Sequence, residues 1–212
     1  MRAIWTRLAL GIAALALTLA SGAANAWMCD FLTGGGFIVN PTTSNGAKAN
    51  FGVGGGCKDG TPTWGHLEYI DHGSGLNVHW TRITAYIEVE SGYNSKGKPI
   101  GIRGICGKAR TNRYGDVDFL VRARDAGEPG TADEFDIRLT QPQGNPAVNV
   151  IVYSTEFFNF PHKLNDGNGG GGNIQLHEPN PSTTGNFTSI DDQAACPADF
   201  VSPPPPPPPP GG

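Results

Sequence analysis

The amino-acid sequence predicts an all-β protein whose antiparallel strands pack as a β-sandwich, jelly-roll-like or similar. Glycine is abundant, with 31 residues in a chain of 212, and helical periodicity is hard to find. Short β-prone runs recur between Gly, Pro, Asn and Asp residues, at a spacing typical of all-β domains. The prediction includes glycine-rich opening and closing strands and a disordered C-terminal tail.

The first 26 residues have the pattern of a secretory signal peptide. Arg2 and Arg7 form a short basic region, residues 8–19 are apolar, and residues 24–26 read Ala-Asn-Ala, an A-x-A cleavage site. An uncleaved membrane anchor is the alternative, but the apolar run is shorter than the ~20 residues that span a bilayer. We expect an exported chain that is periplasmic, at the cell surface or secreted, with no membrane span after cleavage.

Charge and composition divide the remaining chain into a domain and a tail. Loss of Arg2 and Arg7 takes the formal net charge from −4 to −6, and nucleic-acid binding depends on a basic face, so it is not expected. We expect residues 27–178 to form the β domain and residues 179–212 to form a polar and polyproline tail, largely disordered. The tail ends in VSPPPPPPPPGG, a polyproline II rod that is a solvated end, a spacer or a docking segment.

Nine segments are predicted to be strands because β-prone residues are bounded there by turn residues. The longest segment, residues 76–90, is expected to bend or bulge once. The predicted strands are residues 36–39, 47–53, 64–71, 76–90, 100–110, 116–123, 134–140, 148–154 and 172–177.

Alternating side chains in two of these segments, DVDFLVRAR (116–124) and EFDIRL (134–139), predict one apolar face and one solvated face. The solvated face would carry Asp118, Leu120, Arg122, Glu134, Asp136 and Arg138. The segment AVNVIVYS (147–154) is more continuously apolar, so we expect it to lie centrally in the sheet.

The four cysteines, Cys29, Cys57, Cys106 and Cys196, all lie in the exported part of the chain. None forms a C-x-x-C pair, which argues against a zinc ribbon or a redox motif. Because disulfides persist in exported proteins, we expect two structural disulfides. Four cysteines allow three pairings, and the positions of Cys57 and Cys106 in strand-like segments favour 57–106 with 29–196.

Two glycine runs, TGGGFIV (33–39) and GGGGNIQLH (169–177), lead into strands. A phosphate loop leads into a helix N-terminus, and neither run matches its pattern. Glycine in strands marks bulges or a close approach of two backbones. We therefore expect the opening and closing strands to lie close together.

The stretch HLEYIDHGSGLNVHW (66–80) is predicted to be a β-hairpin with a glycine-containing turn. We expect Asp71 to pair with Leu76, which places Glu68 opposite His79, with His66 further along the same face. The set His66, Glu68 and His79 would then suit zinc or a similar ion. The alternative, which the sequence favours, is a Glu–His cross-strand pair on a solvated sheet.

A second group of polar residues lies in DAGEPGTADEF (125–135), where Asp125, Glu128, Asp133 and Glu134 surround a turn. Carboxylate oxygens on a flexible loop suit Ca²⁺. The spacing matches no EF-hand, however, so a solvated acidic turn is the favoured interpretation.

No G-x-S-x-G or H-E-x-x-H motif occurs, so the sequence predicts no enzyme. No cofactor is expected either, with zinc or calcium as the only ions considered. Trp64, Tyr69 and Trp80 would form a sugar-stacking platform if they faced solvent, and core packing is the alternative use of these rings.

Several segments, taken in order, resemble a family of bacterial exported domains that often follow choice-of-anchor modules. These are LTGGGFIVN, GAKANFGVGGG, LNVHW, DEFDIRL, VIVYS and GGGGNIQLHE. The resemblance covers residues 31–178 and implies a β-sandwich module of surface or secreted proteins, a family for which no catalytic residues are established. This chain departs from the family pattern in its cysteines and in the aspartate that follows Phe135.

Together these observations predict an exported, non-catalytic module with a structural or adhesive role at the cell surface or in the periplasm. The alternative is a glycan- or metal-binding module. The expected partner is a glycan or a surface protein.

Overall fold

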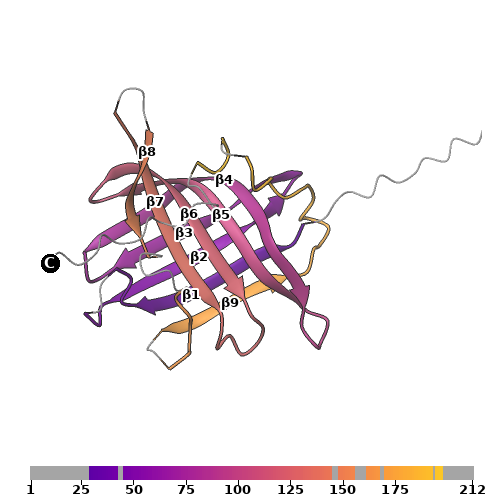
Figure 1. Ribbon diagram of the computed structural model, residues 1–212. Helices are drawn as coiled ribbons and strands as arrows, with labels where there is room; N and C mark the ends of the chain where they lie inside the picture. Colours follow the sequence, from indigo (N-terminus) through magenta and orange to yellow (C-terminus); the bar gives the residue numbers. More distant parts are fainter. Residues whose placement is uncertain are drawn as a thin grey trace, which may run out of the picture.

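The structure is a computed structural model (Figure 1). The predicted signal peptide at residues 1–26 and the polyproline run at residues 203–210 lie outside the described residues. The structure describes residues 29–42, 45–144, 148–155, 161–167, 170–192 and 194–197.

Nine strands and no helix occur in this described part of the chain, which confirms the all-β prediction. Each of the nine predicted segments overlaps one observed strand. The strands are β1 Phe31–Val39, β2 Lys48–Lys58, β3 Thr61–Asp71, β4 Leu76–Tyr93, β5 Pro99–Thr111, β6 Gly115–Asp125, β7 Glu134–Gln143, β8 Val148–Ser154 and β9 Gly171–His177.

The nine strands form one antiparallel sheet in the order β8-β7-β6-β5-β4-β3-β2-β1-β9. From β1 to β8 each strand pairs with the next along the chain, and β9 returns to pair with β1. The ladder ends at β8 and at β9, so the sheet is not closed. The finer prediction of a two-sheet sandwich or jelly-roll is not confirmed, because all strands belong to one continuous ladder.

The sheet curls so that its two halves face each other across the core (Figure 1). Phe51 on β2 stacks on Phe135 on β7, with ring centroids 3.8 Å apart. The hydroxyl groups of Tyr69 on β3 and Tyr153 on β8 lie 2.6 Å apart and are buried. Burying apolar side chains between the two halves is the main stabilising contribution to such a fold.

The opening and closing strands pair directly, as their glycine runs predicted. Gly36 on β1 lies opposite Gly172 on β9. A Cβ atom on Gly36 would lie 2.1 Å from the carbonyl oxygen of Gly171, so only glycine fits without a backbone shift.

The two expected disulfides are present, but the predicted pairing is wrong. Cys29 bonds Cys57, and Cys106 bonds Cys196. Phe31 pairs with Gly56 at the end of the β1–β2 ladder. Cys29, two residues before Phe31, and Cys57, directly after Gly56, are therefore neighbours. Two cysteines 28 positions apart are thus brought together by one antiparallel pairing that the sequence alone did not reveal.

The first part of the predicted tail contacts the sheet in residues 179–192 and 194–197. The Thr188 N–H donates to the Tyr86 carbonyl at 2.8 Å, and Phe187 stacks on Tyr86 with centroids 5.5 Å apart. Cys196 lies in a second apolar cluster with Leu120, whose side chain was predicted to face solvent. This segment therefore covers the outer side of β4–β6.

The predicted solvated face of β7 is also buried, which corrects the expectation of a wet side. Glu134, Asp136 and Arg138 are at most 6 % exposed. This side of β7 is covered by two neighbouring residues, because Thr155 and His162 both bond the Asp136 carboxylate.

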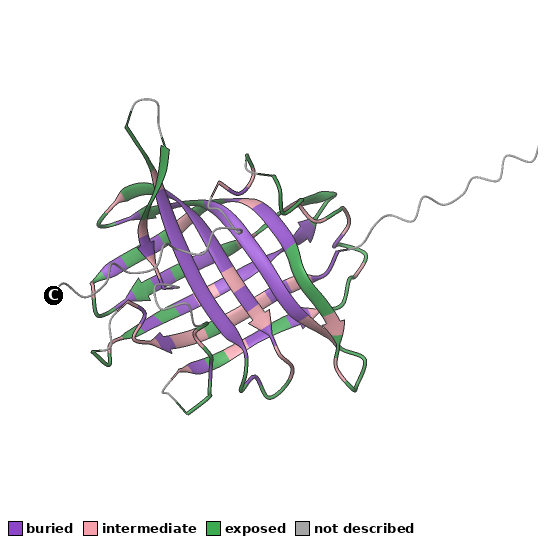
Figure 2. Ribbon diagram, in the orientation of Figure 1, coloured by how far each residue is buried: buried purple, intermediate pink, exposed green. Residues whose placement is uncertain are grey.

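The central position expected for 147–154 is wrong as well, since β8 is an edge strand. Val148, Val150 and Ile151 are 62 %, 39 % and 41 % exposed, and Figure 2 shows the exposed end of β8 extending beyond the buried strands. The long strand β4 has three irregularities against β5 rather than one, between Trp80 and Arg82, Ile83 and Ala85, and Glu88 and Glu90.

Candidate functional site

The β3–β4 hairpin has the predicted register, with Asp71 opposite Leu76 and Glu68 opposite His79. The side chains of Glu68 and His79 contact each other through Oε1 and Nδ1 and are 51 % and 70 % exposed. His66 lies opposite Gly54 on β2, with its ring close to that glycine. The structure thus brings together two of the three candidate metal ligands, and the described residues contain no group of three His, Cys, Asp or Glu that would hold an ion.

The acidic loop between β6 and β7 directs its carboxylates at backbone amides. Asp133 accepts hydrogen bonds from the N–H groups of Ala126 and Ile174, at 2.9 and 2.8 Å. Asp125 accepts from Leu176 at 2.7 Å. Burial raises the pKa of the Asp133 carboxyl, and the amide bonds partly offset this rise. These carboxylates, considered as calcium ligands from the sequence, therefore hold β9 to the end of β6 and to the loop that follows it.

The remaining two carboxylates of the acidic stretch, Glu128 in the loop and Glu134 at the start of β7, also have protein partners. Glu134 pairs with Arg122 at 2.9 Å, and Glu128 accepts a hydrogen bond from the side chain of Asn173 at 3.2 Å. Each of the four residues considered as calcium ligands therefore bonds a group of the chain itself.

A buried guanidinium ties β5 to the start of the described chain. Arg103 is 2 % exposed and pairs with Asp30, and the Tyr86 hydroxyl donates to the same carboxylate at 2.8 Å. Burial lowers the pKa of Arg103, but the hydrogen bond and charge of Asp30 raise it overall. Further acceptors of the guanidinium are the carbonyls of Glu90 and Ile102 and the side chains of Ser91 and Glu88.

A second buried network joins β7 to the segments around it. His162 Nδ1 lies 2.8 Å from Asp136 Oδ1, and its Nε2 lies 3.3 Å from the Asn40 carbonyl oxygen. Both partners accept, so the doubly protonated ring satisfies both contacts. Burial lowers the pKa of His162, but the bond and charge of Asp136 and the Asn40 carbonyl raise it overall.

A third network joins β3 and β8 through hydroxyl groups. The Tyr153 hydroxyl donates to Asp71 Oδ2 at 3.1 Å and accepts from the Tyr69 hydroxyl at 2.6 Å. Burial raises the pKa of both tyrosines. Tyr69 therefore belongs to the core and cannot serve in a sugar-stacking platform.

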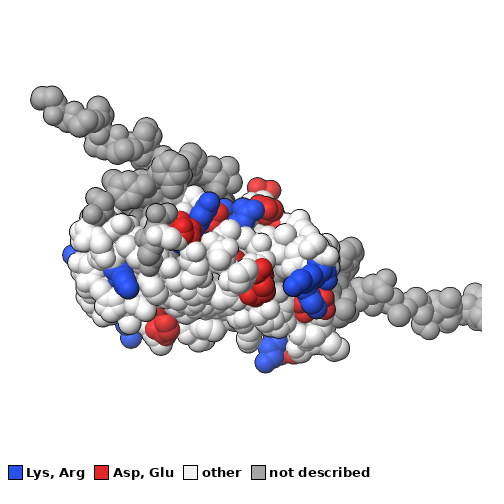
Figure 3. All heavy atoms as spheres, turned by 90° about the horizontal axis from the view of Figure 1, so that it is seen from below, with Lys and Arg blue, Asp and Glu red and all other residues white. Residues whose placement is uncertain are grey.

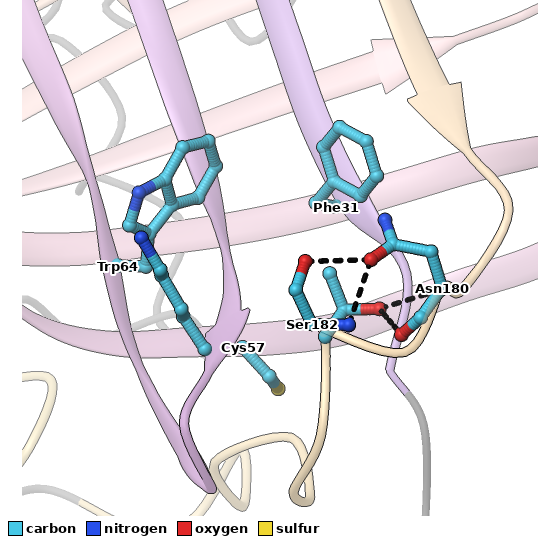
Figure 4. Close-up of a pocket in the computed structure, with 7 residues that line it drawn as sticks. Phe31, Cys57, Trp64, Asn180 and Ser182 are labelled. Atoms are coloured by element: carbon cyan, nitrogen blue, oxygen red, sulfur yellow. Dashed lines mark hydrogen bonds between the residues drawn. The ribbon is translucent and has the colours of Figure 1, made fainter.

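The other two aromatic candidates differ in their surroundings. Trp80 is half-buried and packs against the core. Trp64 on β3 is 37 % exposed and lines a pocket of about 150 Å³ (Figure 4). The residues that line it are Phe31, Cys57, Lys58, Trp64, Asn180, Ser182 and Thr183.

The pocket has an aromatic wall and a polar wall. The rings of Phe31 and Trp64 meet edge to face, with centroids 6.2 Å apart. Beside Phe31, the loop after β9 carries Asn180, whose Oδ1 accepts from the N–H and the hydroxyl of Ser182 at 2.9 and 2.6 Å (Figure 4). Aromatic rings beside a few fixed polar groups are typical of small-ligand sites.

Trp64 was a candidate stacking residue from the sequence alone, but the rest of this pocket was not predicted. Phe31 and Asn180 come from opposite ends of the described chain, and residues after 178 were assigned to a tail. The pattern NPST (180–183) does carry a local signal, because asparagine followed by serine two positions later is typical of a turn closed by the side chain.

Several charged groups on the surface are paired with opposite charges. Examples are Arg124 with Glu90 at 3.1 Å and Lys98 with Glu178 at 3.2 Å. On the face in Figure 3, basic and acidic side chains lie next to one another. This arrangement does not favour a partner recognised by a large field of one sign.

Comparison with protein-family models, curated proteins and solved structures found no significant match to this chain. In the part of the chain that the structure describes, no helix has the length and apolar character needed to cross a membrane.

Proposed function

We propose that this chain is an exported, non-catalytic β module with a structural or adhesive role at the cell surface or in the periplasm. All four cysteines are joined in disulfides, which persist in oxidising compartments and are rare in the cytosol. The resemblance of residues 31–178 to exported domains that follow choice-of-anchor modules supports the same role.

The non-catalytic role is supported by the partners of the buried ionisable groups, which are all groups of the chain itself. Arg103, Asp133 and Asp136 each bond groups on other strands or loops. A general acid or base needs a proton position within reach of a substrate. These three side chains bond other strands and loops, so they stabilise the fold and are not available to exchange a proton with a substrate. A structural module requires this stabilisation.

Export is tested by fractionating cells that express residues 1–212 and detecting the protein with an antibody. We expect it in the periplasm, envelope or medium, without its first 26 residues by intact mass and without free thiols. A cytosolic protein with four free thiols would contradict the proposal.

The adhesive role is tested by incubating purified residues 27–212 with isolated cell envelopes and sedimenting them. We expect saturable retention on the envelopes. Retention no greater than that of an exported protein of similar size and net charge would exclude adhesion.

A glycan-binding role is the second candidate, and the exposed ring of Trp64 beside a polar wall favours it. Binding of the purified chain to a glycan array tests it. We also propose that the curled sheet is a variant of the predicted β-sandwich, and the stacking of Phe51 on Phe135 between the two halves supports this.

A further inference from the structure

We propose that the pocket lined by Phe31 and Trp64 binds a single pyranose ring of a glycan and prefers a ring that carries a carboxylate. This inference rests on the glycan-binding candidate above and assigns it to one site with named contacts.

The aromatic wall is held in place before any ligand arrives. Phe31 stacks on His177 at a centroid distance of 4.4 Å and an interplanar angle of 9°. His177 in turn lies 2.8 Å from the Thr33 hydroxyl through Nε2. Because Phe31 is held by His177, it gives Trp64 a rigid neighbour. The two aromatic side chains therefore lose little conformational freedom when a sugar stacks on the indole.

The polar wall offers donors and acceptors to sugar hydroxyls. Asn180 Oδ1 is engaged by Ser182, and in Figure 4 the amide nitrogen points away from that turn, toward the side of Phe31. Within the described chain no acceptor bonds this nitrogen. The backbone of the turn is itself closed by Thr183, whose hydroxyl donates to the Asn180 carbonyl at 3.0 Å. Asn180 Nδ2 and Ser182 Oγ therefore stand beside the rings as fixed hydrogen-bonding groups.

The size of the pocket limits the ligand to one ring. Its volume is about 150 Å³. Sites for drug-sized ligands occupy roughly 300–1,000 Å³, so this pocket takes a terminal or single sugar rather than an oligosaccharide. We expect an affinity in the millimolar range for a free monosaccharide.

Charge decides between neutral and acidic sugars. Lys58 is the one charged residue among the seven that line the pocket. Without Arg2 and Arg7 the chain carries a formal net charge of −6, which repels an anion at long range, but screening limits this repulsion to about 8 Å at physiological salt. At contact the ammonium group dominates, and we expect up to about fivefold tighter binding of a carboxylated ring, the size of an exposed ion pair.

The test is an NMR titration of ¹⁵N-labelled residues 27–212, with both disulfides formed, against glucose and against glucuronic acid. We expect shifts in the amide signals of residues 58, 64 and 180–183, and tighter binding of glucuronic acid. Trp64→Ala should weaken binding of both sugars by roughly tenfold, as truncation of an anchoring aromatic does. Trp64→Phe should restore part of the loss, and thermal melting verifies that each variant folds.

Two control variants separate the contributions. Tyr93→Ala removes an aromatic ring that is 76 % exposed and lies outside this pocket, so it should leave both affinities unchanged. Lys58→Gln should abolish the preference for glucuronic acid and leave the affinity for glucose unchanged.

Absence of binding by both sugars, or equal affinities of wild type and a folded Trp64→Ala variant, would overturn the inference. Envelope retention then separates the two proposals. A chain that is retained on envelopes without binding either sugar keeps its adhesive role and loses only this site. A chain that neither binds a sugar nor is retained on envelopes would contradict both the adhesive role and this site.

Discussion

Asp133, in the loop before β7, accepts a hydrogen bond from the backbone N–H of Ile174 on β9 at 2.8 Å. Two residues further along, the N–H of Leu176 donates to Asp125 at 2.7 Å. β9 uses its other side to pair with β1, so these carboxylates occupy donors that an added strand would use. One edge of the open sheet is thus capped by side chains of the same chain.

We expect Asp133→Asn to loosen this edge. The carboxylate accepts from Ala126 and from Ile174 through different oxygens, and an amide has one oxygen for the two donors. Leaving one buried donor without its partner costs about 1–3 kcal/mol of unfolding free energy. Urea denaturation measures this loss, and hydrogen exchange at the Ile174 amide should become faster.

Glu128→Gln is the matched control for this edge, since it changes an exposed carboxylate in the same loop. Its effect should stay within about 0.5 kcal/mol. An Asp133→Asn variant with unchanged stability and unchanged exchange at Ile174 would show that the cap has no role in cohesion.

The strands and the hairpin register were predictable because they depend on local patterns. In residues 66–80, alternation on both arms and glycines in the turn leave one register that buries Tyr69 and Val78 together, and the structure has it. The approach of β1 and β9 was predictable for a similar reason, since glycine in a strand has few other uses.

Contacts between distant segments without periodicity were not predictable. Residues after 178 do not alternate, so nothing local signals that Cys196 covers Leu120 or that Asn180 lies beside Phe31. The strand β8 shows the opposite failure, because continuous apolar sequence is typical of a central strand and yet Val148 is 62 % exposed at an edge.

We expect Gly36→Ala to destabilise the pairing of β1 with β9. The added methyl group would lie 2.1 Å from the Gly171 oxygen, and a backbone atom cannot rotate away as a side chain can. Overpacking of this kind costs about 1–3 kcal/mol, measurable by thermal or urea unfolding.

Gly52→Ala is the control for the glycine substitution. Gly52 is also a strand glycine, on β2, but nothing lies within 4 Å of the added Cβ. The variant should be as stable as wild type or slightly more stable, because alanine restricts the unfolded chain. Equal losses at both positions would attribute the effect to glycine in general rather than to the β1–β9 contact.

The two disulfides should differ in how much they stabilise the chain. In the loop-entropy model, cross-links with sequence separations of 28 and 90 contribute about 3.6 and about 4.6 kcal/mol. Replacing Cys106 and Cys196 together by serine should therefore cost about 1 kcal/mol more than replacing Cys29 and Cys57. Peptide mapping without reductant tests the pairing itself, and a peptide that links Cys57 to Cys106 would contradict it.

Stability should depend on pH through His162. The folded-state pKa of this histidine is raised above its ordinary value of about 6.5 by Asp136, despite burial, so protonation favours the folded chain. The stabilisation is fully present below the unfolded pKa and is lost as pH rises through the folded pKa. The difference in unfolding free energy between wild type and His162→Gln should shrink over that window, because glutamine still donates to Asp136 and does not titrate. His72→Gln, at an exposed histidine that bonds Asn50 at 2.9 Å, should follow the pH profile of wild type. A wild-type advantage over His162→Gln that grows with pH would reverse the sign and refute the assignment of the charged ring to the folded state.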